Sequence, residues 1–391
     1  MNYEFIGEQL RLAREQTEMI QLEAAQALGI TSAALSQYEA GKRRVDVLTL
    51  ERLASLYNVS LNYFLGQATN VLDWKTALHS LVKELSLQCK VGIESLIKKV
   101  DALEKLYSLT HTEFPGLPHP PFAALREDNF SNYEVAEYAD RARRYFDLGV
   151  APLLNLHGFL DAQGYKIFTL PLGKEVSDLS GFFFLHPKLG AIVVLNEDQA
   201  WSRIPFTLCH ELAHSLYHYD RPAILCRAND TRHLERFAER FASYFLIPHE
   251  ALDERLYMLG IKKISRPEEI VHLGRYFGVS YKAIFHRLKE ERRLDVSNKS
   301  FEGVKPVSLA KALGYNLSRH EFGERPLALE EKFPRVFLEL TYRVLKTHKL
   351  SSKEAGKMLD IDSNKVNQLF DLDENSYYIN EAEEIEELYL F

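Results

Sequence analysis

The chain has 391 residues, of which 46% are hydrophobic and 26% charged, and this composition predicts a globular protein of about two to four domains. The net charge of -7 excludes a protein coated with nucleic acid over its whole surface, so any contact with DNA must come from a local patch. Three cysteines without paired spacing exclude a disulfide framework, the N-terminus has no signal-peptide pattern, and the apolar stretches are too short to span a bilayer. We therefore expect a cytoplasmic protein without membrane contact.

Residues 1–68 carry a dense series of short helical patterns, which predict an all-α domain. The expected helices lie around residues 6–13, 21–28, 33–40, 48–57 and 61–65. Gly29 and Ile30 form a turn between the second and third helices, Thr31 or Ser32 is the N-cap, and Gly41 ends the third helix. Two helices joined by so short a turn form a helix-turn-helix unit.

Three segments of this domain, residues 7–14, 21–30 and 35–41, resemble the Xre (Cro-like) helix-turn-helix family. The resemblance implies DNA contacts by Gln21, Thr31, Ser32, Ala33, Ser36, Gln37, Lys42, Arg43 and Arg44. However, residues 1–66 hold six basic and eight acidic side chains, and Ala33 and Ala34 offer bases only methyl contacts. A domain that serves dimerisation or docks another such domain stays open as the alternative. We expect a homodimer.

Residues 69–130 are expected to join two domains. Apolar residues at helical spacing between 72 and 107 predict one or two amphipathic helices, which we interpret as a spacer or a dimerising arm. Four prolines between Phe114 and Phe122 exclude regular structure there and predict a semi-rigid linker. A domain boundary therefore falls near residue 130.

Residues 131–295 combine helical and strand patterns. They predict helices at 133–146 and 153–162, and strands at 165–170, 181–185 and 191–195, with residues 186–190 joining the last two strands as a hairpin. A helix-turn-helix-like pattern at 270–288 is expected to pack on this domain or grip a substrate rather than read DNA.

The segment after these strands contains the motif H-E-x-x-H at His210, Glu211 and His214. Residues four apart share a helix face, so the two imidazoles can bind one metal ion, and Glu211 lies where a carboxylate can take a proton from the attacking water. Apolar flanking residues predict a buried helix, whereas the alternative is a surface helix with two solvated histidines. Strands leading into such a helix are typical of small zincins, whose edge strand can hold an extended peptide.

Zinc bound by two histidines needs a third protein ligand, and a helix at 234–247 supplies candidates. Glu235 and Glu239 share one face of this helix, opposite its aromatic core positions. We expect Glu235 to be the third ligand, as in gluzincins, and Glu239 to support a ligand histidine from behind. The alternatives are Glu239 as the ligand, or two solvated surface acids. One Zn²⁺ per chain is expected, with Mn²⁺ as a second candidate.

Residues 203–214 and 235–248 together resemble the ImmA/IrrE metallopeptidase family, over about residues 131–290. The resemblance implies a narrowly selective intracellular zinc endopeptidase, whose relatives often cleave a helix-turn-helix repressor and so activate phage, mobile-element or stress genes. In a related group an Xre-type domain and the peptidase share one chain. Cys209 and Phe237 depart from the family pattern without removing a catalytic part, and Cys209 is expected to fill the core. His186, Tyr217 and His218 are candidates for stabilising the transition state, and the sequence does not choose among them.

Residues 296–391 predict a helical C-terminal domain, with helices near 309–317, 333–346, 351–359 and 361–369. The last pair resembles the small helical tail of helix-turn-helix peptidases. Eight acidic residues between 371 and 387 follow, which we interpret as a solvated segment, with a partner-docking or autoinhibitory tail as the alternative.

Together these patterns predict a mainly α protein with a small β-sheet (α+β): a helix-turn-helix domain at 1–68, a helical linker at 69–130, a gluzincin-like peptidase domain at 131–295 and a helical domain at 296–391. The expected function is a zinc-dependent metalloendopeptidase linked to a DNA-binding module, which cleaves a specific repressor-type protein or itself. Two alternatives stay open. One is a transcriptional regulator whose peptidase fold senses a ligand or partner without proteolysis, which the intact Glu211 disfavours. The other is a component of a toxin–antitoxin or phage-defence pair.

Overall fold

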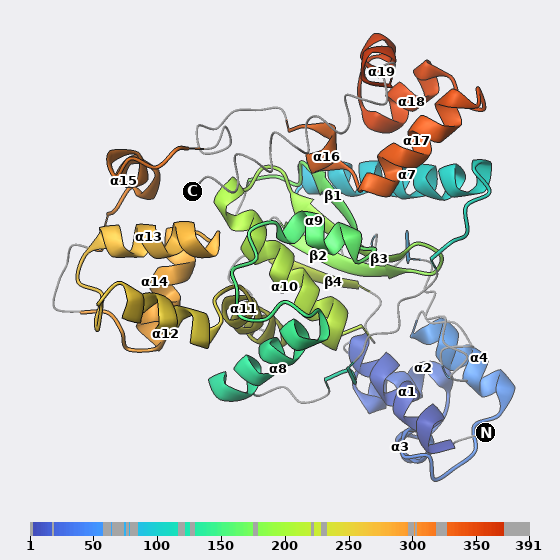
Figure 1. Ribbon diagram of the computed structural model, residues 1–391. Helices are drawn as coiled ribbons and strands as arrows, with labels where there is room; N and C mark the ends of the chain where they lie inside the picture. The colour runs from blue at the N-terminus through green and yellow to red at the C-terminus, as the bar shows by residue number, and fades with distance from the viewer. Residues whose placement is uncertain are drawn as a thin grey trace.

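The computed structural model describes residues 3–17, 19–57, 64, 74–75, 78, 85–115, 122–125, 130–174, 179–219, 223–227, 233–295, 301, 303–317 and 327–370. Helices account for most of these residues and four strands form one sheet, which confirms the α+β class (Figure 1). No helix in this part of the chain combines the length and the apolar character that crossing a membrane requires.

The N-terminal helices form a domain with its own hydrophobic core. They are α1 (Tyr3–Gln16), α2 (Gln21–Leu28), α3 (Ser32–Glu39) and α4 (Val47–Leu56), and their inward-facing residues include Leu10, Leu35 and Leu53. Gly29, with a φ of 67°, turns the chain between α2 and α3, and Thr31 caps α3 by accepting a hydrogen bond from the Ala34 N–H. The predicted helix-turn-helix is thus confirmed, while the helix expected at 61–65 lies outside the described residues apart from Phe64.

A buried ion pair joins α1 to α3. The Arg14 guanidinium donates to both carboxylate oxygens of Glu39, over 2.7 and 3.0 Å. Gly7 lets the two helices approach, because a Cβ there would lie 2.5 Å from the Tyr38 carbonyl oxygen. The bidentate pair and this close contact fix how α3 sits in the domain.

The sheet consists of β1 (Lys166–Leu170), β2 (Leu179–His186), β3 (Gly190–Asn196) and β4 (Ala223–Arg227), in the order β1-β3-β2-β4. β1 runs parallel to β3, whereas β2 pairs antiparallel with β3 and β4. The three predicted strands and the hairpin are confirmed. The sequence did not predict β4, a short strand that follows the H-E-x-x-H helix and ends the sheet.

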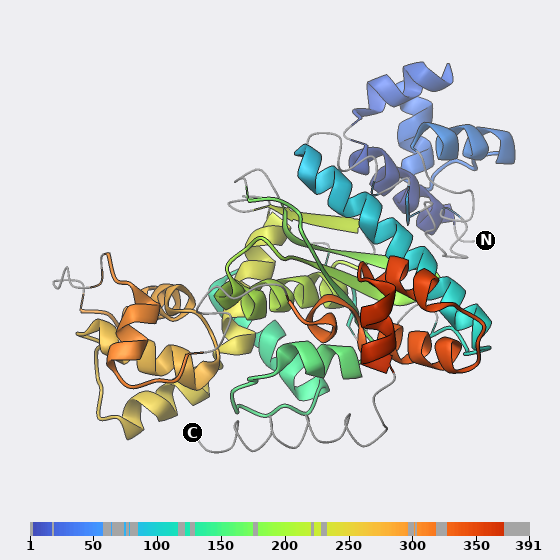
Figure 2. The same ribbon diagram turned by 90° about the horizontal axis from the view of Figure 1, so that it is seen from above.

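Alternate side chains of the sheet enter two helical layers, which lie on opposite faces of the strands (Figures 1 and 2). Phe183 and Val193 pack on the layer of α8 (Asn132–Tyr145), α9 (Leu156–Ala162), α10 (Ile204–Tyr217) and α11 (His233–Leu246). Phe182 and Ile192 pack on the layer of α7 (Leu87–Leu109) and α17 (Arg335–Lys346). Because both faces are covered, the central strands read as unbroken apolar runs.

The interpretation of residues 72–107 as a spacer or dimerising arm is wrong for α7. Its apolar side shares a core with the sheet and with α17, through residues such as Ile93, Leu103, Phe182 and Phe337. Helical spacing predicts the helix but cannot say which surface covers it. The predicted linker, peptidase domain and C-terminal domain therefore share one core here. Residues 116–121 of the Pro-rich linker and the acidic residues 371–391 lie outside the described residues.

Short helices complete the fold at both ends of the sheet. They are η1 (Trp201–Arg203), α12 (His249–Met258), α13 (Pro267–Phe277), α14 (Tyr281–Glu290), α15 (Pro306–Ala312), α16 (Leu329–Lys332), α18 (Ser352–Leu359) and α19 (Ser363–Phe370). In Figure 1, α12 to α15 lie on the left, whereas the N-terminal domain and α17 to α19 lie on the right.

Candidate functional site

Helix α10 presents the H-E-x-x-H motif on its buried side. Pro205 lies in the first turn of this helix. Backbone N–H groups there form no hydrogen bond within the helix, so the N–H that proline lacks is not needed. His210 and His214 lie one turn apart, both are buried, and their Nε2 atoms are 3.1 Å apart. The two nitrogens converge on one point, so the alternative of two solvated histidines on a surface helix is wrong.

Glu235 approaches these nitrogens from the first turn of α11. Its Oε2 lies 3.1 Å from His210 Nε2, and its Oε1 lies 3.6 Å from His214 Nε2. The three residues are buried, and their donor atoms all lie within 4.8 Å of one another. Two imidazole nitrogens and one carboxylate oxygen form the donor set of catalytic zinc sites that keep a fourth position open. The residues present therefore fit a zinc ion.

The charges of this cluster support cation binding. Burial acts to raise the pKa of Glu235, but hydrogen bonds with His210 and His214 outweigh burial and hold that pKa well below its usual range. Burial likewise acts to lower the pKa of His210, whereas its hydrogen bond with Glu235 and the charges of Glu211 and Glu239 raise the pKa above its usual value. Glu235 is thus ionised at neutral pH, which is the form of a carboxylate that binds a metal.

Glu211 is fully buried and has a glycine of β2 beside it. A Cβ added at Gly181 would lie 3.2 Å from Glu211 Oε1, 2.9 Å from Thr207 Cγ2 and 2.8 Å from the Val194 carbonyl oxygen. Glycine therefore lets α10 lie close to the sheet at the position of Glu211. The sequence shows Gly181 only as the start of a strand, and no pattern in it indicates this contact.

His218 follows α10 and contacts the far side of His214. The Nδ1 atoms of the two rings lie 2.9 Å apart, so one donates a hydrogen bond to the other and the His214 ring keeps its Nε2 directed at Glu235. Glu239, to which we assigned such a supporting role, is exposed one turn after Glu235, and its charge acts on His210. The supporting role of Glu239 stays a prediction.

Three other residues named from the sequence have structural contacts, and one of them, His186, lies against α7, with its Nε2 3.1 Å from Glu104 Oε1. Tyr217 donates its hydroxyl hydrogen to the Tyr138 carbonyl, and His186 accepts the Leu189 N–H at the β2–β3 turn, so both side chains serve packing. Cys209 is fully buried, and burial raises the pKa of its thiol well above the usual value. Its expected place in the core is confirmed.

Arg143 of α8 anchors the C-terminal end of α11. The residue is 3% exposed, and its guanidinium donates to the carbonyl oxygens of Phe245 at 2.7 Å, Gly149 at 2.7 Å and Ala151 at 2.6 Å. This residue therefore fixes the helix that carries Glu235. From the sequence, an arginine in an amphipathic helix is expected at the surface, so no pattern predicts that Arg143 is buried against the end of α11.

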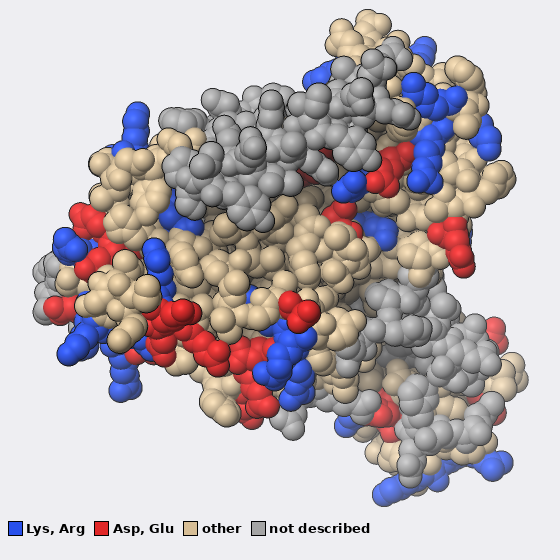
Figure 3. Space-filling model, viewed as in Figure 1, with Lys and Arg blue, Asp and Glu red and all other residues tan. Residues whose placement is uncertain are grey.

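On the N-terminal domain, most of the expected DNA contacts lie at the surface of α3 and of the loop after it. The exposed side chains are Ala33, Ser36, Gln37, Lys42, Arg43 and Arg44, whereas Ser32 is half-buried and Thr31 caps the helix. Lys and Arg gather at the lower tip of this domain in Figure 3. Gln21 lies differently, because its amide donates to Glu39 Oε2 over 2.7 Å and is held against this buried carboxylate.

Two protein-family models match separate parts of this chain. A model described as "IrrE N-terminal-like domain" matches residues 160–289, and a model described as "Helix-turn-helix" matches residues 10–64. The first match contains the H-E-x-x-H helix and Glu235. The second contains the turn between α2 and α3.

Similar proteins occur in Bacillus subtilis (strain 168). The HTH-type transcriptional regulator ImmR is 44% identical over 62 residues, which cover 16% of this chain and 49% of ImmR. The uncharacterized HTH-type transcriptional regulator YqaE is 38% identical over 64 residues, 16% of this chain and 55% of that protein. The SPbeta prophage-derived uncharacterized HTH-type transcriptional regulator YonR is 30% identical over 108 residues, 28% of this chain and 95% of YonR.

The aligned segments thus span about half the length of ImmR and YqaE, 49% and 55%, and nearly all of YonR, 95%. The chain belongs to the family of HTH-type transcriptional regulators to which YonR belongs, and its residues 160–289 in addition match the IrrE N-terminal-like domain.

Proposed function

We propose that this protein is a zinc-dependent endopeptidase whose Xre-like domain binds DNA. The observation that carries the proposal is the convergence of His210, His214 and Glu235 on one point, with Glu211 buried on the same helix. A structural zinc site would use its full set of protein ligands, whereas three protein donors leave a position for water or substrate. The general base beside them is the further part that peptide hydrolysis needs.

His210, His214 and Glu235 are the residues that would hold the metal, which supplies a Lewis acid for the scissile carbonyl when bound. Glu211 takes the proton of the attacking water and returns it to the leaving amine. The hydrophobic layer around α10 and α11 excludes bulk water and keeps these charges close. Among the described residues, β4 ends the sheet order, and its outer edge is the place where we expect an extended substrate to pair.

We propose a specific helix-turn-helix protein as substrate, or this chain's own N-terminal domain. The ImmR-like segment supports a link to gene regulation, since ImmR is described as a transcriptional regulator. Lys42, Arg43 and Arg44 would contact phosphates, while Ser36 and Gln37 offer hydrogen bonds to base edges. Cleavage would then release repression at the site to which the chain is bound.

The test compares Glu211→Gln with the wild type, on the chain itself and on a repressor encoded beside it. We expect cleavage to fall by at least a hundredfold while bound zinc stays unchanged, because Glu211 is not among the three converging donors. Glu254→Gln, at an exposed position on α12, is the matched control and should cleave like the wild type. If Glu211→Gln regulates its target as the wild type does, the chain is instead a regulator that works without proteolysis.

A further inference from the structure

The turn between α2 and α3 recurs near the C-terminus with the same hydrogen bond. In the first case the Ile30 N–H donates to the Ala25 carbonyl over 3.0 Å, and in the second the Ile361 N–H donates to the Gly356 carbonyl over 3.0 Å. Gly29 and Asp360, the residues just before these isoleucines, both have left-handed backbone angles, with φ of 67° and 55°. The helices on either side are eight residues long in both cases.

The side chains of the two units match at the positions that build the turn. Glu23 and Glu354 each occupy the third position of the first helix and accept hydrogen bonds from the backbone before it. Four buried positions also match between the two units. In the first helix, Ala24 corresponds to Ala355, Ala25 to Gly356 and Leu28 to Leu359; in the second helix, Leu35 corresponds to Val366. The pair α18–α19 is therefore a second helix-turn-helix with the backbone geometry of α2–α3.

The exposed face of α19 is better suited to base edges than that of α3. Asn364, Lys365 and Gln368 are exposed, and their amide and ammonium groups can hydrogen-bond to bases and phosphates. At the first two of these positions α3 has Ala33 and Ala34, which offer only methyl groups. A third turn of this kind joins α13 and α14, where the Val279 N–H donates to the Gly274 carbonyl over 3.0 Å, and the exposed residues at the positions of Asn364 and Gln368 are there Lys282 and His286.

The segment that includes α17 carries an excess of basic residues, whereas α18, α19 and the turn between them hold three basic and three acidic residues. Residues 335–370 contain seven Lys and Arg and four Asp and Glu, whereas residues 1–66 contain six basic and eight acidic residues. Figure 3 shows blue side chains over α17 to α19 at the upper right. Lys353, Lys357 and Lys365 are all exposed on α18 and α19. Such a local basic surface provides the electrostatic part of DNA binding in a chain that is acidic overall.

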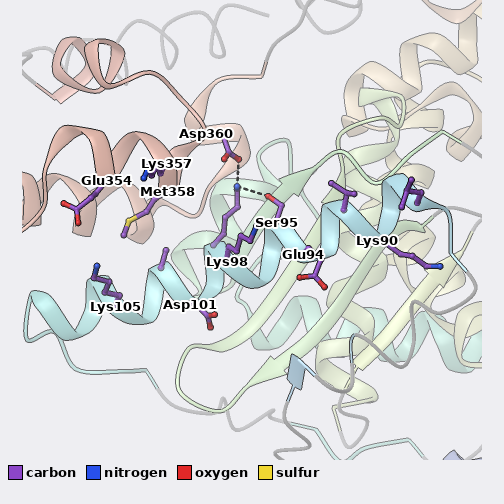
Figure 4. Close-up of a pocket in the computed structure, with 14 residues that line it drawn as sticks. Lys90, Glu94, Ser95, Lys98, Asp101, Lys105, Glu354, Lys357, Met358 and Asp360 are labelled. Atoms are coloured by element: carbon purple, nitrogen blue, oxygen red, sulfur yellow. Dashed lines mark hydrogen bonds and ion pairs between the residues drawn. The ribbon is translucent and has the colours of Figure 1, made fainter.

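A contact between α7 and the turn that joins α18 to α19 fixes this unit on the rest of the protein. Lys99 of α7 is buried, and its ammonium group pairs with Asp360 and donates to Ser95 Oγ over 3.0 Å. Figure 4 shows this contact in the groove of about 860 Å³ between α7 and α18, which is lined both by lysines such as Lys98 and Lys105 and by acidic residues such as Glu94 and Glu354. The exposed face of α19 is therefore held in a defined orientation on the helix that covers the sheet.

We propose that α18–α19 is a second duplex-DNA-binding helix-turn-helix, with α19 in the major groove and the lysines of α18 and α19 on the phosphates. The chain thus has two DNA-binding surfaces, one before and one after the peptidase core. In Figure 1 both lie on the right of the molecule, the N-terminal domain at the bottom and α18–α19 at the top. This proposal does not depend on zinc or on proteolysis.

The test is the binding of the full-length chain to a fluorescein-labelled duplex of mixed sequence, measured by anisotropy at several salt concentrations. The variant Lys353→Gln/Lys357→Gln/Lys365→Gln should bind more weakly than the wild type. Each phosphate contact that it loses should weaken binding about eightfold at 0.1 M salt, and should make the negative slope of log K against log salt less steep by about 0.9. The matched control removes three exposed lysines elsewhere, Lys262→Gln/Lys263→Gln/Lys311→Gln, and should bind almost as the wild type does. Equal slopes for the two triple variants would overturn the proposal, and would indicate that this surface recruits an acidic protein instead.

A second measurement tests base reading and leaves the lysines intact. Duplexes selected by the wild type from a randomised pool should be bound at least tenfold more weakly by Asn364→Ala/Gln368→Ala, because alanine cannot form the bidentate hydrogen bonds that distinguish one base from another. The variant Arg43→Gln/Arg44→Gln, in the N-terminal domain, should leave the recognition by α19 in place. If the selected sequences depend on the N-terminal variant alone, α19 does not read DNA.

Discussion

Replacing Gly181 with alanine tests how closely α10 must approach the sheet. The new Cβ would lie 2.8 Å from the Val194 carbonyl oxygen and 2.9 Å from Thr207 Cγ2, both shorter than a normal carbon contact. The carbonyl belongs to the paired strand β3 and cannot turn away, so the strain must shift α10 and with it Glu211, whose Oε1 would be 3.2 Å from the Cβ. Overpacking of this kind costs about 1–3 kcal/mol.

We expect Gly181→Ala to lower the free energy of unfolding by that amount in urea titrations and to reduce cleavage of the repressor substrate. Bound zinc should stay at the wild-type level, because its three expected ligands lie on α10 and α11 and can move together. Ser180→Ala, one residue earlier in β2, is the control, and Gly181→Ala/Thr207→Ser should regain part of the stability by removing the methyl group. Wild-type stability and cleavage in Gly181→Ala would refute the reasoning.

Three further substitutions test other contacts of the core. His218→Ala should weaken zinc binding by about 10–100-fold in chelator competition, since His214 loses the ring that orients it; an unchanged affinity would contradict this role. Arg143→Met should lower the free energy of unfolding by about 3 kcal/mol in urea, because three carbonyls lose a charged donor, and a decrease below about 0.5 kcal/mol would count against it. Burial lowers the pKa of His186 to about 4, below the roughly 6.5 of an unfolded chain, so its stabilising contribution is complete above about pH 6.5 and disappears as the pH falls toward 4. When the pH is lowered from 7 to 5, the free energy of unfolding should therefore decrease by about 1 kcal/mol more in the wild type than in His186→Gln, after allowance for solvent screening. Parallel profiles of unfolding free energy against pH for the two proteins would contradict this.

Much of the fold follows from local patterns in the sequence. The strands β1, β2 and β3, helix α10 and the turn at Gly29 are confirmed because apolar spacing, turn residues and a cap agree there. Placing Glu235 beside the two histidines depended on combining helical periodicity with the ligand count of zinc. The geometry agrees with that combination, although the metal itself stays a prediction.

Other parts depend on contacts between distant segments, which periodicity cannot provide. α7 has a clear apolar face, but the sheet that covers it is formed by residues about 60 or more positions later. β4 is five residues long and is defined by pairing with β2. Arg143 and Gly181 have no signal in the sequence, and His218 is one of several histidine and tyrosine candidates there; the role of each depends on the place where α8, β2 and α10 meet their neighbours.

The metal content of the purified chain tests the central claim most directly. Elemental analysis of the wild type and of Glu254→Gln should find about one zinc per chain, because His210, His214 and Glu235 supply three converging donors. Glu235→Gln should lose most of this zinc, since a neutral amide replaces a carboxylate that is ionised at neutral pH. A wild type without bound metal, or a Glu235→Gln variant that holds zinc as tightly as the wild type, would contradict the account.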